Sequence, residues 1–323
     1  MSAVIRLENV SLHLQSGGQP VPILADVSLA IEPAEMLGLV GESGSGKSMT
    51  VRTINRLLPA GAVVGGRVCF GEHDLQTISG NRLREVRTSG LATVFQDPRA
   101  HINPIRRIGD FLVEALVTNL KVNRNEATER AAALLDEVGI DDHRRRLRQY
   151  PHEMSGGMLQ RVMIAAALTC DPKLLLADEP TTALDVTIQG EIMAILQDLR
   201  ERRGMAILFI THDLELAAAT CDRIAVMYAG RLVEQQHAAG LFERPGHPYT
   251  KGLLGARPHV GGPPHRLQDI PGRPARLGEL GGCSFAPRCA HADDDCRTEV
   301  PPRRRLEGDG WACCVRPEGA RDG

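Results

Sequence analysis

The sequence lacks any apolar stretch long enough to cross a membrane. A transmembrane helix needs about 20 consecutive apolar residues, whereas the apolar run at residues 207–210 has only the length of a strand. The first ten residues, MSAVIRLENV, also lack the basic start and apolar core of a signal peptide. We therefore expect a chain that reaches a membrane only through a partner.

The chain also lacks a strong net charge. Its formal charge at pH 7 is −2 over 323 residues, so electrostatics give no reason to expect nucleic acid as a partner. We find no internal repeat and no low-complexity segment. The length is sufficient for one large α/β domain with an appendage, or for two modest domains.

Regular structure is expected to be scarce in the last part of the chain, where prolines and cysteines gather. Eleven of the 20 prolines lie in the last 80 residues, which is too dense for long helices or strands. Five of the eight cysteines lie there too. In a chain without an export signal, such a group of cysteines indicates a metal site before disulfides.

Strand and helix patterns alternate before this tail, as in a layered α/β domain. Apolar residues at helical spacing between 127 and 138 predict an inserted helical subdomain at about residues 97–160. The other expected elements are a strand at 36–40, a helix from Lys47 through Leu57 and Leu58 to Pro59, strands at 174–177 and 205–210, a helix at 186–202, and a hairpin of 223–228 and 231–235 around Ala229-Gly230.

Residues 41–48, Gly-Glu-Ser-Gly-Ser-Gly-Lys-Ser, match G-x-x-x-x-G-K-[ST] between the first of these strands and the helix. We call this segment the phosphate loop. Its glycines let the backbone N–H groups turn toward phosphates, and the helix N-terminus adds partial positive charge. Lys47 is expected on the β- and γ-phosphates of ATP and Ser48 on Mg²⁺. The predicted nucleotide-binding residues here are Gly41, Ser43, Gly44, Ser45, Gly46, Lys47, Ser48 and Met49.

An apolar strand ending in two acids supplies the second half of such a site. Leu174 to Ala177 is followed directly by Asp178 and Glu179. Asp178 at the strand end is expected to hold Mg²⁺ through water, and Glu179 to activate the attacking water as general base.

Tyr150 to Arg161, with Ser155, Gly156 and Gly157 at its centre, resembles the LSGGQ signature of ABC ATPases. We call residues 155–157 the signature segment. In that family this segment binds the γ-phosphate held by the phosphate loop of the opposite subunit. A serine-capped helix start alone would not explain two glycines, which weaken a first helical turn.

Three further residues or segments match motifs of the ABC ATPase family. Gln96 matches the glutamine that contacts Mg²⁺ and senses the γ-phosphate. Residues 183–185, Ala-Leu-Asp, match the D-loop, in which Asp185 crosses the dimer interface. His212 matches the switch histidine that steadies the γ-phosphate. Gln96 is expected to hold Mg²⁺ together with Ser48 and Asp178.

The sequence departs from the family pattern in two places. Methionines stand at 154 and 158, where leucine and glutamine are usual, and both are compatible with packing. The position of the aromatic residue that stacks on adenine in many relatives holds Leu14. We assign no residue to base stacking.

The tail narrows the resemblance. Gly230 to Glu234, Pro245 to Thr250 and Gly282 to Cys289 resemble the dipeptide, oligopeptide and nickel importer ATPases of the ABC family. The resemblance implies a second homologous ATPase subunit, two transmembrane permease subunits and, indirectly, an external solute-binding protein. It places the chain at the cytoplasmic face of the inner membrane, attached through the permeases.

The resemblance also bears on the tail cysteines, whose spacing is C-x5-C-x6-C-x16-C for Cys283, Cys289, Cys296 and Cys313. Zinc sites usually contain C-x2–4-C pairs, so these gaps favour a 4Fe-4S cluster over zinc. Free thiols stay open as a third interpretation, and Cys314 is an alternative to Cys313.

The sequence thus predicts an α/β fold with a P-loop NTPase (RecA-like) ABC ATPase core, an antiparallel β portion, an inserted helical subdomain and an irregular cysteine-containing C-terminal unit. We expect an ABC ATPase domain at 1–240 and a C-terminal extension at 241–323. The expected function is ATP hydrolysis that powers import of a small solute, above all di- or oligopeptides. The alternative is a soluble ABC ATPase of DNA repair or translation, although the chain has neither the long coiled coil nor the second cassette typical of those proteins.

Overall fold

A computed structural model describes residues 3–182, 184–256, 269–277 and 281–316 of the chain. The chain divides into two compact units, each assembled from separate segments. We call Met1–Ile5, Ile31–Glu35 and Phe70–Phe209 the helical unit. Arg6–Ala30, Met36–Cys69 and Ile210–Gly323 form the sheet unit. The division expected from the sequence, at residue 240, stays a prediction.

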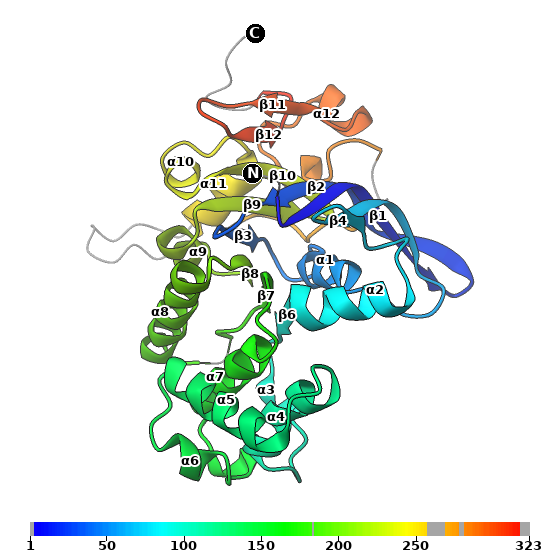
Figure 1. The fold of residues 1–323 in the computed structure, drawn as a ribbon. Coiled ribbons are helices and arrows are strands. Elements are labelled where there is room, and N and C mark those ends of the chain that lie inside the picture. The colour runs from blue at the N-terminus through cyan, green and yellow to red at the C-terminus, as the bar shows by residue number, and fades with distance from the viewer. Residues whose placement is uncertain (1–2, 183, 257–268, 278–280, 317–323) are drawn as a thin grey trace. The chain divides into compact units, whose positions relative to one another are not determined.

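The helical unit contains the predicted insertion, visible as the green helices in Figure 1. Helices α4, α5 and α7 pack against one another, and α7 also packs on α3 and on strand β6. Buried alanines and leucines on one face of α5, among them Ala127, Ala131 and Leu135, hold this bundle together. The helices of the helical unit are α2 (Gly80–Glu85), α3 (Pro98–His101), α4 (Ile108–Thr118), α5 (Arg124–Glu137), α6 (His143–Arg146), α7 (Gly156–Leu168) and α8 (Val186–Arg203), with a π-helical turn (Val86–Gly90) and a 3-10 turn (Pro151–Glu153).

The strands of the helical unit lie in the order β8-β7-β6. They are β6 (Leu91–Val94), β7 (Leu174–Asp178) and β8 (Ala206–Thr211), the last of which runs into the sheet unit, and a short β5 (His73–Asp74) lies before them. β6 and β7 are parallel, with Val94 opposite Ala177. The apolar residues of β7 are fully buried, as expected for a parallel strand covered on both faces.

The sheet unit has two sheets. Within this unit the strands of the first sheet lie in the order β2-β1-β4, and they are β1 (Ile5–Ser16), β2 (Gln19–Ile31) and β4 (Val63–Phe70). The second has the order β11-β12-β10-β9-β3, from β3 (Met36–Val40), β9 (Arg223–Tyr228), β10 (Arg231–His237), β11 (Arg303–Arg305) and β12 (Trp311–Cys313). Its helices are α1 (Lys47–Ile54), α9 (Leu214–Thr220), α10 (Ala238–Glu243), α11 (Pro248–Gly255) and α12 (Asp294–Thr298), with a 3-10 turn at Ala286–Arg288.

The predicted hairpin is confirmed. β9 and β10 are antiparallel, with Arg231 opposite Tyr228. Ala229 and Gly230 both have positive φ, 44° and 77°, as a tight two-residue turn requires. The prediction for the helix after the phosphate loop is only partly right, because α1 ends at Ile54 rather than near Pro59. Arg56 is left-handed, with φ 55°, and the N–H of Leu57 bonds back to Arg52, which closes the helix early.

The C-terminal segment joins the second sheet. β12 pairs antiparallel with β10, with Glu234 opposite Ala312.

No helix within the described ranges is both long and apolar enough to span a bilayer.

Candidate functional site

The phosphate loop follows β3 in the sheet unit, and α1 begins at Lys47 as predicted. Gly41 has φ 153°, and a Cβ there would lie 2.2 Å from the carbonyl oxygen of Met227. Only glycine therefore fits at this position. Ser43 and Gly44 at the tip of the loop are exposed, so the loop opens toward solvent.

Two side chains of the phosphate loop suit an anionic ligand. Lys47 is only 5% exposed, and its Nζ donates to the carbonyl oxygens of Gly41 at 2.7 Å and Glu42 at 3.0 Å. The Oγ of Ser45 is buried and has no hydrogen-bond partner in the part of the chain that the structure describes. A buried ammonium group and an unsatisfied hydroxyl at a helix N-terminus fit a phosphate group.

His212 also belongs to the sheet unit. It is exposed and lies between β8 and α9. The following residue, Asp213, caps α9 by accepting from the N–H groups of Glu215 at 2.9 Å and Leu216 at 3.0 Å. The cap fixes the backbone on which His212 is presented.

Gln96 and Glu179 meet in the helical unit. Each follows the end of one of two paired parallel strands, β6 and β7, and such strand ends lie at the same edge of a sheet. Gln96 Nε2 donates to Glu179 Oε2 at 3.2 Å, and Thr182 Oγ1 donates to the same oxygen at 2.9 Å. Glu179 has φ 49°, a conformation that costs free energy for a non-glycine residue. Asp178, the last residue of β7, is half-buried beside it in the sequence.

The signature segment also lies in the helical unit. The Ser155 hydroxyl caps α7 by accepting from the Met158 N–H at 3.3 Å. A Cβ at Gly157 would lie 2.8 Å from Cγ2 of Ile188, so glycine lets the start of α7 approach the start of α8. Asp185 caps α8 by accepting from the Ile188 N–H at 3.0 Å. Ala183 of the predicted D-loop lies outside the described residues.

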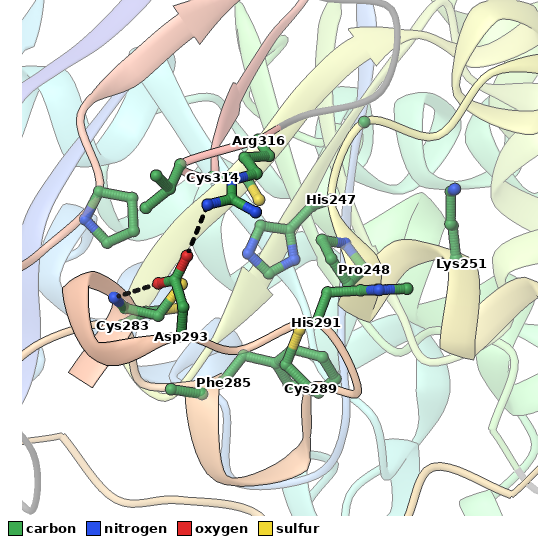
Figure 2. Close-up of a pocket in the computed structure, with 15 residues that line it drawn as sticks. His247, Pro248, Lys251, Cys283, Phe285, Cys289, His291, Asp293, Cys314 and Arg316 are labelled. Carbon is green, nitrogen blue, oxygen red and sulfur yellow. Dashed lines mark hydrogen bonds and ion pairs between the residues drawn. The ribbon is translucent and has the colours of Figure 1, made fainter.

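Four of the five tail cysteines surround one cavity of about 220 Å³, shown in Figure 2. We call it the cysteine cavity. Asp293 lies at its wall, where it accepts from the Cys296 N–H at 3.0 Å and pairs with Arg316 at 3.1 Å. His247 also lines it. The cysteines that line it are Cys283, Cys289, Cys296 and Cys314.

The expected cluster of Cys283, Cys289, Cys296 and Cys313 is not supported. Cys313 is the last residue of β12 and lines a second cavity, which Cys283 also lines, whereas Cys314 follows the strand and lines the cysteine cavity. Among the described residues, no three His, Cys, Asp or Glu side chains lie close enough to hold a metal ion. The residues as arranged therefore do not fit a 4Fe-4S cluster or zinc.

Sequence reasoning missed three residues at these sites. Thr182 bonds to Glu179, and both Tyr249 and Arg288 contact Glu42 in the phosphate loop. Tyr249 and Arg288 lie in segments that were recognised only as marks of a family. Leu14, noted in place of a stacking aromatic residue, is half-buried within β1.

Comparison with known proteins decides the family. Residues 24–182 match the ABC transporter family, and residues 233–296 match the oligopeptide/dipeptide transporter C-terminal region. A probable peptide ABC transporter ATP-binding protein of Sinorhizobium fredii, y4tR, is 46% identical over 97% of this chain and 95% of its own length. The chain belongs to the peptide-transporter group of ABC ATP-binding subunits.

The chain is also similar to other members of this group and to solved structures of ABC cassettes. The oligopeptide transport ATP-binding protein OppD of Escherichia coli is 40% identical, covering 98% of this chain and 94% of OppD. The dipeptide transport protein DppD of the same organism is 41% identical, covering 98% and 97%. The structure of cbiO1 from Clostridium perfringens, part of the ABC transporter complex cbiONQ, has a TM-score of 0.66 at 26% identity over 75% of this chain and 92% of cbiO1.

A dimeric ATP-binding cassette, MJ0796, in a post-hydrolysis state with ADP and phosphate has a TM-score of 0.65 at 28% identity, over 72% of this chain and 98% of that one. The predicted α/β fold of an ABC ATPase is thereby confirmed, and so is the prediction of an ABC-type transport ATPase. As a member of this family, the subunit uses ATP and Mg²⁺. The alternative of a soluble repair or translation ATPase is not favoured, because the match includes the transporter C-terminal region.

Proposed function

We propose that this ABC subunit hydrolyses ATP with Glu179 as general base and thereby powers the import of di- or oligopeptides. The observation that carries the assignment is the arrangement of Glu179, whose Oε2 accepts from both Gln96 and Thr182 at the edge of two parallel strands. Two donors on one carboxylate oxygen fix the orientation of the side chain, which a base needs to accept a proton from a positioned water molecule.

The phosphate loop binds the triphosphate in this proposal. Its backbone N–H groups and the N-terminus of α1 face the anionic oxygens, and Lys47 moves from the carbonyl oxygens of Gly41 and Glu42 to the β- and γ-phosphates. Ser48, Gln96 and Asp178 hold Mg²⁺, which neutralises charge on the phosphate oxygens. His212 contacts the γ-phosphate.

Each complete site takes the signature segment from a facing subunit. In this subunit Ser155, Gly156 and Gly157 open α7 with their N–H groups at the helix start, and Ser155 is exposed. Asp185 is exposed too, and the neighbouring Val186 exposes 83% of its surface. The start of α8 is therefore accessible to a facing subunit.

The partners are a second homologous ATPase, two transmembrane permeases and, on the other side of the membrane, a solute-binding protein. We place the permease contact at residues 98–104, near the inner face of the membrane. Ile105, which follows this segment, exposes 81% of its surface, so the segment is accessible to a partner. ATP-driven closure of the ATPase pair, followed by hydrolysis and opening, then drives the permeases.

Peptide uptake tests this proposal. Cells that carry the complete transporter should take up radiolabelled di- or oligopeptides, and the Glu179→Gln variant should abolish uptake while the complex still assembles. Assembly with uptake of another solute but no peptide would refute the substrate class. Full uptake by Glu179→Gln with the partner ATPase also disabled would refute the general base.

A further inference from the structure

A buried arginine from the C-terminal segment contacts the phosphate loop. Arg288 is the last residue of the 3-10 turn Ala286–Arg288, and its side chain is only 4% exposed. Its Nη1 donates to Glu42 Oε2 at 2.7 Å, and its Nη2 donates to Glu42 Oε1 at 3.0 Å. Glu42 is the second residue of the phosphate loop. The two parallel bonds form a bidentate pair, the strongest ion-pair geometry available to arginine.

Every donor of this guanidinium group has a partner. Nε donates to the carbonyl oxygen of Pro271 at 2.8 Å, and Nη2 also donates to that of Ile270 at 3.2 Å. Nη1 also donates to the Tyr228 hydroxyl at 3.4 Å. Hydrogen bonding to Glu42 raises the pKa of Arg288 further above its ordinary value, so the positive charge is permanent. The arginine is therefore fixed in position before any ligand arrives.

Residue 42 is held at its backbone as well. Its N–H donates to the Tyr249 hydroxyl at 2.8 Å, and its carbonyl oxygen accepts from Lys47 at 3.0 Å. Tyr249 packs in a cluster with Tyr228 and Phe285, with tilted or edge-to-face rings whose centroids lie 4.6 to 5.4 Å apart. The amide, the carbonyl and the carboxylate of Glu42 thus each have a defined partner, and two of the three come from the C-terminal half of the sheet unit.

The charge of Glu42 is the reason why this matters for binding. A carboxylate inside a loop that must hold three phosphates repels them, and the repulsion is strong where water is excluded. The Arg288 guanidinium cancels that charge at hydrogen-bonding distance. An arginine that only anchored the tail could pair with any surface carboxylate, as Arg297 does with exposed Asp294 at 2.8 Å.

We propose that Arg288 is a positioning residue for ATP: it neutralises Glu42 and fixes the second peptide of the phosphate loop, so that the C-terminal segment sets the affinity of the loop for the triphosphate. The proposal rests on the proposed function, since it requires that residues 41–48 bind ATP. It gives the C-terminal region of this subunit a role at the nucleotide site.

Two substitutions with different expected effects on nucleotide affinity test the proposal. The probe is the non-hydrolysable ATP analogue AMP-PNP with Mg²⁺, titrated calorimetrically into the full-length subunit. Arg288→Met leaves the Glu42 carboxylate uncompensated, so its Kd should rise by on the order of 10-fold or more. Glu42→Gln removes the repulsive charge, so its Kd should not rise. The double variant should return to within about threefold of the wild type, because the two effects are coupled.

The matched control is Arg297→Met, which removes the same side chain from an exposed ion pair and should leave the Kd unchanged. A purely structural anchor predicts a different result: Arg288→Met and Glu42→Gln would both raise the Kd, together with a lower Tm, and the double variant would be no better than either. That result would overturn the proposal, as would an unchanged Kd in Arg288→Met. If Arg288→Met does not fold, the direction of the change in Glu42→Gln still decides.

The Lys47→Ala variant distinguishes a failure of the proposed function from a failure of the proposed role of Arg288. A wild-type subunit that binds the analogue no better than Lys47→Ala would refute the proposed function itself. A wild-type subunit that binds tightly, with Lys47→Ala impaired and Arg288→Met normal, would refute only the role of Arg288.

Discussion

Gln96 Nε2 donates a hydrogen bond of 3.2 Å to Glu179 Oε2, joining the residues that follow two neighbouring parallel strands. The bond links the proposed general base to a residue of the segment that leads to the proposed permease contact at 98–104. A change at the permease that moved this segment would thus alter the orientation of the base. If both proposals hold, this hydrogen bond connects the permease contact to the base that hydrolyses ATP.

Glu179→Gln should lower ATP turnover by on the order of 100-fold or more, because the amide cannot accept the proton of the attacking water. Nucleotide binding should persist, since the amide keeps the size of the side chain, and the closed dimer should be long-lived. Phosphate release and size-exclusion chromatography with ATP measure both effects. Thr182→Val is the graded control: it removes one hydrogen bond but retains the carboxylate, so turnover should fall less. Equal losses in both variants would argue against Glu179 as the base.

Lys47→Ala should clearly weaken nucleotide binding by the purified subunit. The substitution removes the only ammonium group of the phosphate loop, which is buried and poised on the carbonyl oxygens of Gly41 and Glu42. Lys47→Met keeps the length and apolar volume of the side chain and should be similarly impaired if charge is the cause. Normal affinity in Lys47→Met would mean that the loop does not bind phosphate through this charge.

His247 should make the fold sensitive to acid. Burial lowers the pKa of His247 to about 4 from an ordinary 6.5, so the folded protein keeps the ring neutral while the unfolded chain protonates it below pH 6.5. The associated stability is present above pH 6.5 and is lost as pH falls toward 4, by roughly 3 kcal/mol. Urea denaturation at pH 7 and pH 4.5 measures this loss.

His247→Asn is the control for that measurement. His247 Nδ1 accepts from the Tyr249 N–H at 3.1 Å and caps α11, and asparagine can make the same cap without titrating. The variant should lose less stability than the wild type between pH 7 and pH 4.5. An identical loss in both proteins would assign the acid sensitivity to other groups.

The isolated subunit should hydrolyse ATP slowly, because each complete site needs the signature segment of a facing chain. Activity should rise steeply on addition of the partner ATPase and the permeases. Sedimentation under assay conditions reports the oligomeric state alongside the rate. A monomer with full activity would contradict a shared site.

Local patterns predicted much of this molecule. The start of α1 at Lys47, the strand at 36–40 and the turn at Ala229-Gly230 each depend on residues adjacent in sequence, and all three are as expected. The early end of α1 depends on the left-handed Arg56, for which the sequence has no glycine to give a signal. Short-range reasoning could not place that break.

Long-range contacts account for the rest. Glu42 and Arg288 are far apart in sequence, and neither charge indicates the other before the chain is folded. Cys313 and Cys314 are adjacent in sequence, yet only Cys314 lines the cysteine cavity, and no pattern in the sequence indicated this difference. Resemblance to a family identified the segments that contain Tyr249 and Arg288 but gave neither residue a role, and the cluster that it favoured at the tail cysteines is not supported among the described residues.

The pairing of β12 with β10 also constrains how the chain is made. Glu234 emerges from the ribosome well before Ala312, its partner across the ladder, so β10 has only β9 beside it while the cysteine-containing segment is still being synthesised. During that interval its outer edge presents unpaired N–H and C=O groups, which can recruit strands from other nascent chains. Translation that stops after α11 therefore leaves a permanently open sheet edge, and such a product is expected to aggregate rather than persist as a smaller ATPase.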